Sequence, residues 1–292
     1  HVRVGHPQAY IPKSPYVFNH YGLFFCAPYG NTPYYSFVFW DLLMAVQLTP
    51  YQVIEFDEID STSGFLKSQL QLGELKGYSF CIARKQTQGY GQRGRQWIHS
   101  DQSLAFSLSV PFDLDIHRFS YLSSSVALLL RNCLARHSSL EYKVKWPNDI
   151  FVDEGKVAGS LLEMVRNKKT KEAYLVLGIG INLSNVSAEK DTFHSSWISD
   201  LNRDAFLTDF GKAIYTLFIQ AKDSLAFKPE EWSKYDFFSP NQPVIVYHSD
   251  HYEVGLYKGL TNSAEVQVEI DGRVDCYQSG AISIRPITSE QT

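Results

Sequence analysis

Two glycines at alternate positions inside an apolar run constrain the fold more than any other feature of the chain. Gly178 and Gly180 alternate with leucine and isoleucine within Tyr174–Leu183. Glycine weakens a strand interior, so two glycines on one face of a strand indicate that another group approaches the sheet closely there. Either a flat ligand or a packed helix would fit, and the sequence leaves both readings open.

A second glycine-rich segment has the sequence GYGQRGRQW. Gly89, Gly91 and Gly94 let the backbone approach a ligand closely, so that consecutive N–H groups can converge on an anion. Arg93 and Arg95 add forked donors that suit phosphate or carboxylate. Short glycine motifs also occur in ordinary surface turns, so this segment alone does not separate an anion site from a solvated turn.

The third segment, KWPNDIFVDEGKVAG, predicts a β-hairpin with Gly155 at its tip. Pro147 restricts the tryptophan before it to extended geometry. Asp149 and Lys156 are then expected to face each other across the hairpin. A Pro-Asn turn followed by an exposed lysine would have the same sequence, so a plain surface hairpin remains the alternative.

Composition narrows the class of protein. A chain of 292 residues with 44% hydrophobic content can bury a sizeable core and is expected to form two domains. The net charge of −4 is not the basic footprint of a nucleic-acid binder, so no nucleic-acid partner is expected. The 4 cysteines show no metal or redox spacing, which fits a reducing, cytoplasmic location. Neither a transmembrane stretch nor a secretory signal is evident, which predicts no membrane partner.

The periodicity predicts an N-terminal extension followed by two domains. Residues 1–43 are crowded with aromatic side chains, show neither helical nor strand periodicity, and end before Met44. The residues after Met44 contain segments with helical periodicity and segments with strand periodicity. Strands are predicted over 53–59, 78–83, 104–110 and 174–183, the third half-buried, and helices from a Ser61 or Thr62 cap to 70, over 119–136 and over 209–227.

This mixture of helices with a largely antiparallel sheet predicts an α+β domain over residues 44–238. Alternating valines and isoleucines after Pro243 predict a small β-barrel over residues 239–292.

The order of six motifs resembles the biotin protein ligase family. They are DST (60–62), QTQGYGQRGRQW (86–97), KWPND (145–149), KVAG (156–159), GIGIN (178–182) and GAISIRP (280–286). KWPND followed by KVAG at this spacing is the most specific of them. The resemblance spans residues 55–286 and implies a class II synthetase-like catalytic domain followed by an SH3-like barrel.

The reaction that the resemblance implies is ATP-dependent formation of a carbon–nitrogen bond between biotin and one lysine of a carrier. That carrier would be a biotin carboxyl carrier protein or domain of the acetyl-CoA carboxylase or pyruvate carboxylase type. Biotin and ATP would first give biotinoyl-5′-AMP and pyrophosphate, with Mg²⁺ bound through ATP. Since this step brings a carboxylate against the α-phosphate, cations and backbone dipoles must offset the repulsion.

The resemblance also assigns roles by motif. Lys156, Asp149 and Arg93 are expected to be catalytic, with Lys156 bridging the carboxylate and α-phosphate as a point charge. Asp149 is further expected to act on the carrier amine and to hold Mg²⁺ weakly, through ATP. The expected biotin-binding residues are Ser61, Thr62, Gln86, Gly89, Tyr90, Gln92, Lys156, Gly159, Gly178 and Gly180. The expected ATP-binding residues are Arg93, Arg95, Trp97, Lys145, Asn148, Asn182 and Arg285.

The chain departs from the family pattern at three positions. Tyr90 and Gln92 stand where many members have arginine, so the loop is less cationic than the common form, and Ala281 replaces the usual glutamate. The loop departures concern how tightly the intermediate is retained and not the class of reaction.

Two alternative functions stay open. A lipoate or octanoate ligase or transferase shares the fold, whereas a catalytically silent biotin-binding regulatory protein would keep the pocket alone. The presence of Lys156 argues against a catalytically silent protein. Residues 1–43 hold only Arg3 and Lys13 as firm cations, too few for the DNA-binding winged helix of bifunctional members, so a monofunctional ligase is expected. The resemblance leaves a homodimer open.

Overall fold

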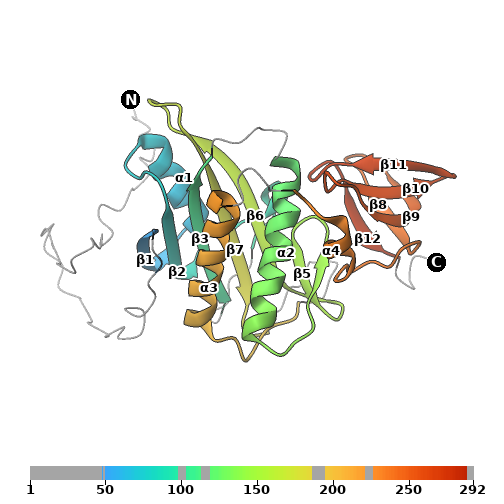
Figure 1. The fold of residues 1–292 in the computed structure, drawn as a ribbon, viewed down its shortest axis with the longest axis horizontal. Coiled ribbons are helices and arrows are strands. Elements are labelled where there is room, and N and C mark those ends of the chain that lie inside the picture. Colours follow the sequence, from blue (N-terminus) through green and yellow to red (C-terminus); the bar gives the residue numbers. More distant parts are fainter. Residues whose placement is uncertain are drawn as a thin grey trace, which may run out of the picture.

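A seven-stranded sheet and a five-stranded sheet organise the fold, which we describe from a computed structural model (Figure 1). The structure describes residues 48, 50–97, 103–112, 119–185, 195–220 and 226–287. The predicted extension, residues 1–43, lies outside them.

The larger sheet has the strand order β1-β2-β3-β7-β6-β5-β4. Only the first pair, β1 with β2, is parallel, and the other neighbours are antiparallel. The strands are β1 (Gln52–Ile59), β2 (Ser79–Gln86), β3 (Ser103–Pro111), β4 (Lys143–Lys145), β5 (Asp149–Val152), β6 (Gly155–Arg166) and β7 (Ala173–Asn182). The predicted α+β class with a largely antiparallel sheet is confirmed.

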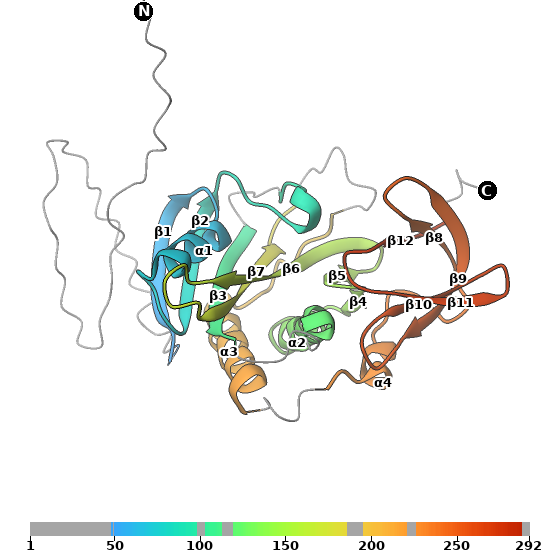
Figure 2. The same ribbon diagram turned by 90° about the horizontal axis from the view of Figure 1, so that it is seen from above.

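Helices cover both faces of this sheet. The helix α1 (Thr62–Leu72) packs on one face, and α2 (Phe119–His137) and α3 (Arg203–Tyr215) lie on the other (Figure 2). Ser61 caps α1, as predicted, by accepting a hydrogen bond from the Gly64 amide. None of the helices among the described residues has the length and apolar character needed to span a membrane.

The prediction of a helix over 209–227 was wrong at its start and at its end, where Phe227 is not helical. The helix α3 begins at Arg203 because Asn202 accepts a hydrogen bond from the Ala205 amide at 3.2 Å and so caps it. A π-helical turn, η4 (Thr216–Gln220), follows α3 directly.

The strand β3 is buried on both faces, so the prediction of a half-buried strand was also wrong. Phe106 stacks on Phe80 with ring centroids 5.2 Å apart and meets Phe210 of α3 edge-on at 5.8 Å. On the opposite face, Ser107 and Ser109 are fully buried and hydrogen-bonded. The alternation of apolar and small polar residues in β3 therefore distinguishes two buried faces of the sheet, and does not distinguish a buried face from a solvent-exposed one.

The second sheet is antiparallel, with strand order β11-β10-β9-β8-β12, and agrees with the predicted small β domain. Its strands are β8 (Pro243–Tyr247), β9 (Tyr252–Leu260), β10 (Val266–Ile270), β11 (Arg273–Tyr277) and β12 (Ser283–Pro286), and α4 (Pro229–Ser233) precedes them. Two hydrogen bonds join the segments around the two sheets: Trp146 Nε1 donates to the Ala264 carbonyl at 2.9 Å, and the Tyr257 hydroxyl donates to Asp236 at 2.5 Å. Residues beside β5 are therefore fixed against the C-terminal sheet.

Candidate functional site

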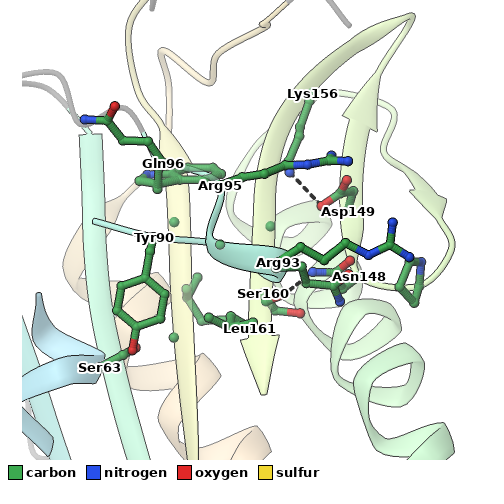
Figure 3. Close-up of a pocket in the computed structure, with 18 of the residues that line it drawn as sticks. Ser63, Tyr90, Arg93, Arg95, Gln96, Asn148, Asp149, Lys156, Ser160 and Leu161 are labelled. Atoms are coloured by element: carbon green, nitrogen blue, oxygen red, sulfur yellow. Dashed lines mark hydrogen bonds and ion pairs between the residues drawn. The ribbon is translucent and has the colours of Figure 1, made fainter. Parts of the chain in front are cut away.

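A single pocket on the α1 side of the larger sheet brings the predicted motifs together (Figure 3). It is lined by the start of α1, the glycine-rich loop, the segment from β4 to β6, the strand β7 and the start of β12. Of the residues predicted from sequence, all except Gly89 and Gly94 line it. Whether each of them binds biotin or ATP stays a prediction.

One end of the pocket carries a network of small polar side chains. The backbone amide and the hydroxyl of Thr62 both donate to Gln86 Oε1, at 2.8 and 3.0 Å. Ser107 lies 2.7 Å from the Thr62 hydroxyl and 2.8 Å from that of Ser63. The start of α1 thus holds several donors and acceptors in fixed positions, which suits a neutral polar ligand group.

The two glycines of β7 are explained by two different neighbours. A Cβ at Gly178 would lie 2.5 Å from the Ser63 hydroxyl of α1, so the helix-packing reading applies there. A Cβ at Gly180 would lie 2.8 Å from Trp97 Nε1, so the flat group over Gly180 is an indole of the chain itself. The helix-packing reading thus holds at Gly178, whereas the group close to Gly180 belongs to the chain and not to a ligand.

Trp97 closes one wall of the pocket. Its Nε1 is buried and finds no hydrogen-bond acceptor among the described residues. Lys156 Nζ stands 5.4 Å from the centre of the indole ring, within cation–π range. A buried N–H without an acceptor is costly, so a ligand atom that accepted from it would stabilise this arrangement.

The opposite end of the pocket is the predicted hairpin, where Lys156 Nζ and Asp149 Oδ1 form an ion pair at 2.7 Å (Figure 3). Their side chains are 31% and 22% exposed. The predicted facing of these residues is confirmed, but they are not a register pair: Asp149 pairs with Gly159, and an irregularity in the β5–β6 pairing intervenes.

Gly155 is not the hairpin tip, contrary to prediction. The turn is Asp153–Glu154, with Asp153 at φ 51°, and Gly155 is the first residue of β6. Gly155 is needed for space, because a Cβ there would lie 2.5 Å from the Ser196 Cβ.

The pocket is strongly basic although the chain is acidic overall. Among the described residues, five cationic side chains line it, against one carboxylate, Asp149; they are Arg93, Arg95, Lys145, Lys156 and Arg285. Lys145 is only 5% exposed, and burial lowers its pKa to about 8, with Lys156, Arg285 and Arg95 adding to the effect and Asp149 opposing it. A site that holds this much like charge is suited to a polyanion.

The glycine-rich loop is folded as a small hairpin. Tyr90 pairs with Gln96 in an antiparallel bridge, the Gly91 amide donates to the Arg95 carbonyl at 2.8 Å, and a 3₁₀ turn, η2 (Gln92–Gly94), forms the tip. The Gly91 amide is therefore satisfied within the loop and does not join an anion site. Gly89 is buried behind the loop, where its carbonyl accepts from the Trp97 amide at 2.9 Å.

The tip and the base of the glycine-rich loop are both attached to other elements. Arg93 Nη2 donates to the Gly280 carbonyl of the C-terminal domain at 2.9 Å. At the base, the Tyr90 hydroxyl donates to Glu163 Oε2 at 3.0 Å, and Lys67 Nζ forms an ion pair with Glu163 Oε1 at 2.6 Å. Burial raises the pKa of the Tyr90 phenol, which therefore stays a donor.

Two asparagines hold the walls in place. Asn148 is buried and donates from Nδ2 to the Ser160 carbonyl, while the Ser160 amide donates to the Asn148 carbonyl at 3.1 Å (Figure 3). Asn182 donates from Nδ2 to the carbonyls of Lys156 and Ser196, both at 3.2 Å. The side-chain nitrogens of both residues thus serve the backbone around Lys156.

Sequence reasoning missed several lining residues, most clearly Ser63, Ser107, Ser160 and Leu161. A signal existed for Ser107, since three serines alternate with apolar residues in a strand that is apolar enough to be central. The other three become neighbours of the pocket only through the packing of α1 and β6.

Comparison with known proteins identifies relatives. Residues 55–182 match the model of the biotin/lipoate A/B protein ligase family. The bifunctional ligase/repressor BirA of Escherichia coli (strain K12) is 30% identical over 249 residues, covering 82% of this chain and 76% of that protein. The biotin–[acetyl-CoA-carboxylase] ligase of Paracoccus denitrificans is 36% identical over 112 residues, 38% of this chain and 46% of that protein.

A solved structure has the same fold. Biotin protein ligase from Aquifex aeolicus in complex with biotin and ATP superposes with a TM-score of 0.64 at 23% identity, over 80% of this chain and 99% of that one. Sequence and fold agree, and the chain belongs to the biotin protein ligases, an enzyme class within the biotin/lipoate A/B protein ligase family.

Proposed function

We propose that the protein joins biotin to a lysine of a biotin carboxyl carrier protein, through a biotinoyl-5′-AMP intermediate made from ATP. The observation that carries the proposal is the Lys156–Asp149 ion pair, 2.7 Å long, set among further cations in a pocket whose other end is neutral and polar. A ligand with a neutral polar head and a carboxylate tail matches that polarity.

In the first step, a biotin carboxylate oxygen attacks the α-phosphorus of ATP and pyrophosphate leaves. Lys156 offers its ammonium to both anions, while Arg93, Arg95 and Arg285 offset the charge of the phosphates. Lys145 adds a buried charge behind them, which stabilises anions more than a solvated one would.

The polar network at the start of α1 would orient biotin. Its Thr62, Gln86 and Ser107 side chains, fixed by hydrogen bonds of 2.7 to 3.0 Å, supply the donors and acceptors that a cyclic urea requires. The buried N–H of Trp97 is a further donor available to the ligand.

Magnesium ions prefer oxygen ligands and retain several waters, so few protein groups are needed to hold Mg²⁺ on ATP phosphates. The Asp149 carboxylate and the Asn148 side-chain carbonyl fit this requirement, since both line the pocket near the cations. The ion would neutralise phosphate charge there.

In the second step, the amine of the carrier lysine attacks the carbonyl carbon of the mixed anhydride. The carbon–nitrogen bond forms, the carbon–oxygen bond to AMP breaks, and AMP leaves with the electron pair. Asp149 is placed to take the proton from the amine, since its carboxylate lines the pocket beside Lys156.

The test is ATP–pyrophosphate exchange with biotin, then with lipoate, followed by transfer of label to a carrier domain. The proposal expects exchange with biotin only, and label on one carrier lysine. Exchange with lipoate alone would assign the protein to the lipoate ligases, which share the fold. The absence of exchange with both acids, in protein that binds biotin, would leave a silent binding protein and refute the adenylate route.

A further inference from the structure

A cluster of two histidines and one glutamate lies on the C-terminal domain, at the turn between β8 and β9. The strands end in the pair Tyr247 and Tyr252, and the loop between them is closed by the His248 amide, which donates to the His251 carbonyl at 2.9 Å. The two imidazole rings stack with centroids 4.3 Å apart and planes 3° from parallel. The hairpin therefore holds the two rings face to face, and one of them must rotate for both rings to bind the same ion.

The donor atoms of the cluster converge. Glu253 on β9 directs Oε2 to His248 Nε2 at 3.0 Å and to His251 Nε2 at 4.0 Å. One ligand atom from each of the three residues lies within 4.8 Å of the other two. Zinc bonds of about 2.0 to 2.2 Å to nitrogen and oxygen place donors closer than this, a distance that side-chain rotation alone can cover.

The hydrogen bond on the far side of His251 sets its tautomer. His251 Nδ1 lies 2.8 Å from Asp250 Oδ1, and a carboxylate only accepts, so Nδ1 carries the proton. In the neutral ring, Nε2 then presents a lone pair toward the Glu253 carboxylate. Two acceptors that face each other repel unless a cation lies between them. A carboxylate behind a ligating histidine is a common outer-shell arrangement at metal sites.

Charge and access favour a divalent ion as this cation. The Asp250 and Glu253 carboxylates place two negative charges beside the two imidazole rings. The side chains of His248, His251 and Glu253 are 20%, 55% and 39% exposed, so an ion can enter from solvent. Imidazole nitrogen with one carboxylate is a donor set that suits zinc and its neighbours in the first transition row more than magnesium or calcium.

We propose that His248, His251 and Glu253 bind one divalent transition-metal ion of the zinc class, with His251 oriented by Asp250. Three protein ligands leave at least one position for water. The ion ties the end of β8 to β9, outside the biotin and ATP pocket, since none of the three residues lines that pocket.

The competing explanation is that a proton takes the place of the metal. A protonated histidine beside Glu253 would also satisfy the contacts, as an ion pair at 3.0 Å. The two explanations differ in stoichiometry, since only the metal site binds an equivalent of zinc at neutral pH.

The test is calorimetric titration of the full chain, freed of metal by chelation, with Zn²⁺ at pH 7.5, and absorption spectra of the Co²⁺ form. The wild type should bind one equivalent that is lost in His251→Ala and in Glu253→Gln. Asp250→Asn should retain the equivalent with affinity lowered about 10- to 100-fold, because Asp250 orients His251 and adds charge but is not itself a ligand. Co²⁺ should give visible bands in the wild type and none in His251→Ala or Glu253→Gln.

The matched control is His137→Gln, which removes a histidine at the end of α2 that contacts the carboxylate of Asp209 on α3 at 3.0 Å. It should bind zinc like the wild type. Circular dichroism establishes that each variant is folded, and Glu253→Gln, which keeps the side-chain shape, decides the question should His251→Ala unfold. Equal stoichiometry and affinity in wild type, His251→Ala and Glu253→Gln would overturn the proposal.

Discussion

The indole of Trp97 occupies the space into which a Cβ at Gly180 would project, with Nε1 2.8 Å from that position. Trp97, which forms a wall of the pocket, therefore packs directly against Gly180.

Gly180→Ala should therefore displace the indole. Overpacking of this kind costs about 1–3 kcal/mol in the free energy of unfolding, and it should lower ligation activity as well. In a Trp97→Ala background the same substitution should cost much less, because the obstacle is gone. Urea denaturation of the four proteins completes the cycle. Additive effects of the two substitutions would show that the indole leaves Gly180 in solution.

Lys156→Ala should remove most biotinoyl-AMP formation while the protein stays folded. The ion pair with Asp149 is partly exposed, so its loss should cost no more than about 1 kcal/mol of stability. Pyrophosphate exchange measures the first effect and thermal unfolding the second. Lys258→Ala, which removes a lysine paired with Glu269 at 2.6 Å on the C-terminal domain, is the matched control and should keep full activity. Near-normal exchange in Lys156→Ala would refute the assignment.

Gln92→Arg should slow the release of biotinoyl-AMP. Gln92 lines the pocket at the tip of the loop, where an arginine would add a charge-assisted hydrogen bond to the intermediate. A gain of roughly 1.4 kcal/mol corresponds to about tenfold in the dissociation rate. Gln88→Arg adds the same charge at an exposed position that does not line the pocket, and should leave the rate unchanged. Equal off-rates for Gln92→Arg and wild type would place position 92 away from the ligand.

The burial of Lys145 predicts that its charge lowers the stability of the protein and favours ATP binding. Its pKa falls from 10.5 to about 8, so the penalty of burying the ammonium is complete below pH 8 and is relieved as pH rises toward 10.5. Lys145→Met should therefore stabilise the protein at pH 7, by at most about 3 kcal/mol at roughly 1.4 kcal/mol per pKa unit. The same variant should raise the KM for ATP. In the wild type that KM should rise above pH 8, and in Lys145→Met this step should be absent. A variant less stable at pH 7 would contradict the prediction.

Asp236 predicts a pH-dependent stability. Burial raises its pKa from 3.8 to about 7, despite the hydrogen bond from Tyr257. The folded state then retains a proton that the unfolded chain releases between these values, so stability should increase as pH falls from 8 toward 5. Asp236→Asn should flatten that slope and raise the melting temperature at pH 8, whereas Asp271→Asn, at an exposed turn, should do neither. A melting temperature that falls from pH 8 to pH 6 in the wild type, and by the same amount in Asp236→Asn, would count against this role.

Features set by neighbouring residues could be predicted from the sequence. The Ser61 cap depends on the residues that follow it, and the Asp149–Lys156 pair depends on a hairpin with a short turn. Turn details were less accessible: the left-handed residue is Asp153, and Gly155 is required by Ser196, forty-one positions further on.

Contacts between distant segments could not be predicted. Nothing in the spacing of Tyr90 and Glu163 indicates their hydrogen bond, which exists because the loop folds back over β6. The identity of the flat group over Gly180 was open for the same reason. Periodicity also does not distinguish a strand between two helical layers from one that faces solvent, as β3 shows.

The buried bond from Trp146 to Ala264 joins the motif most specific to the site with a residue of the C-terminal sheet. Arg93 makes a second bond to the C-terminal part of the chain, an exposed one to the Gly280 carbonyl. Dividing the chain between α4 and β8 would give two fragments whose working site depends on their reassembly. The affinity between the fragments, more than the folding of either, would then set the activity recovered by complementation.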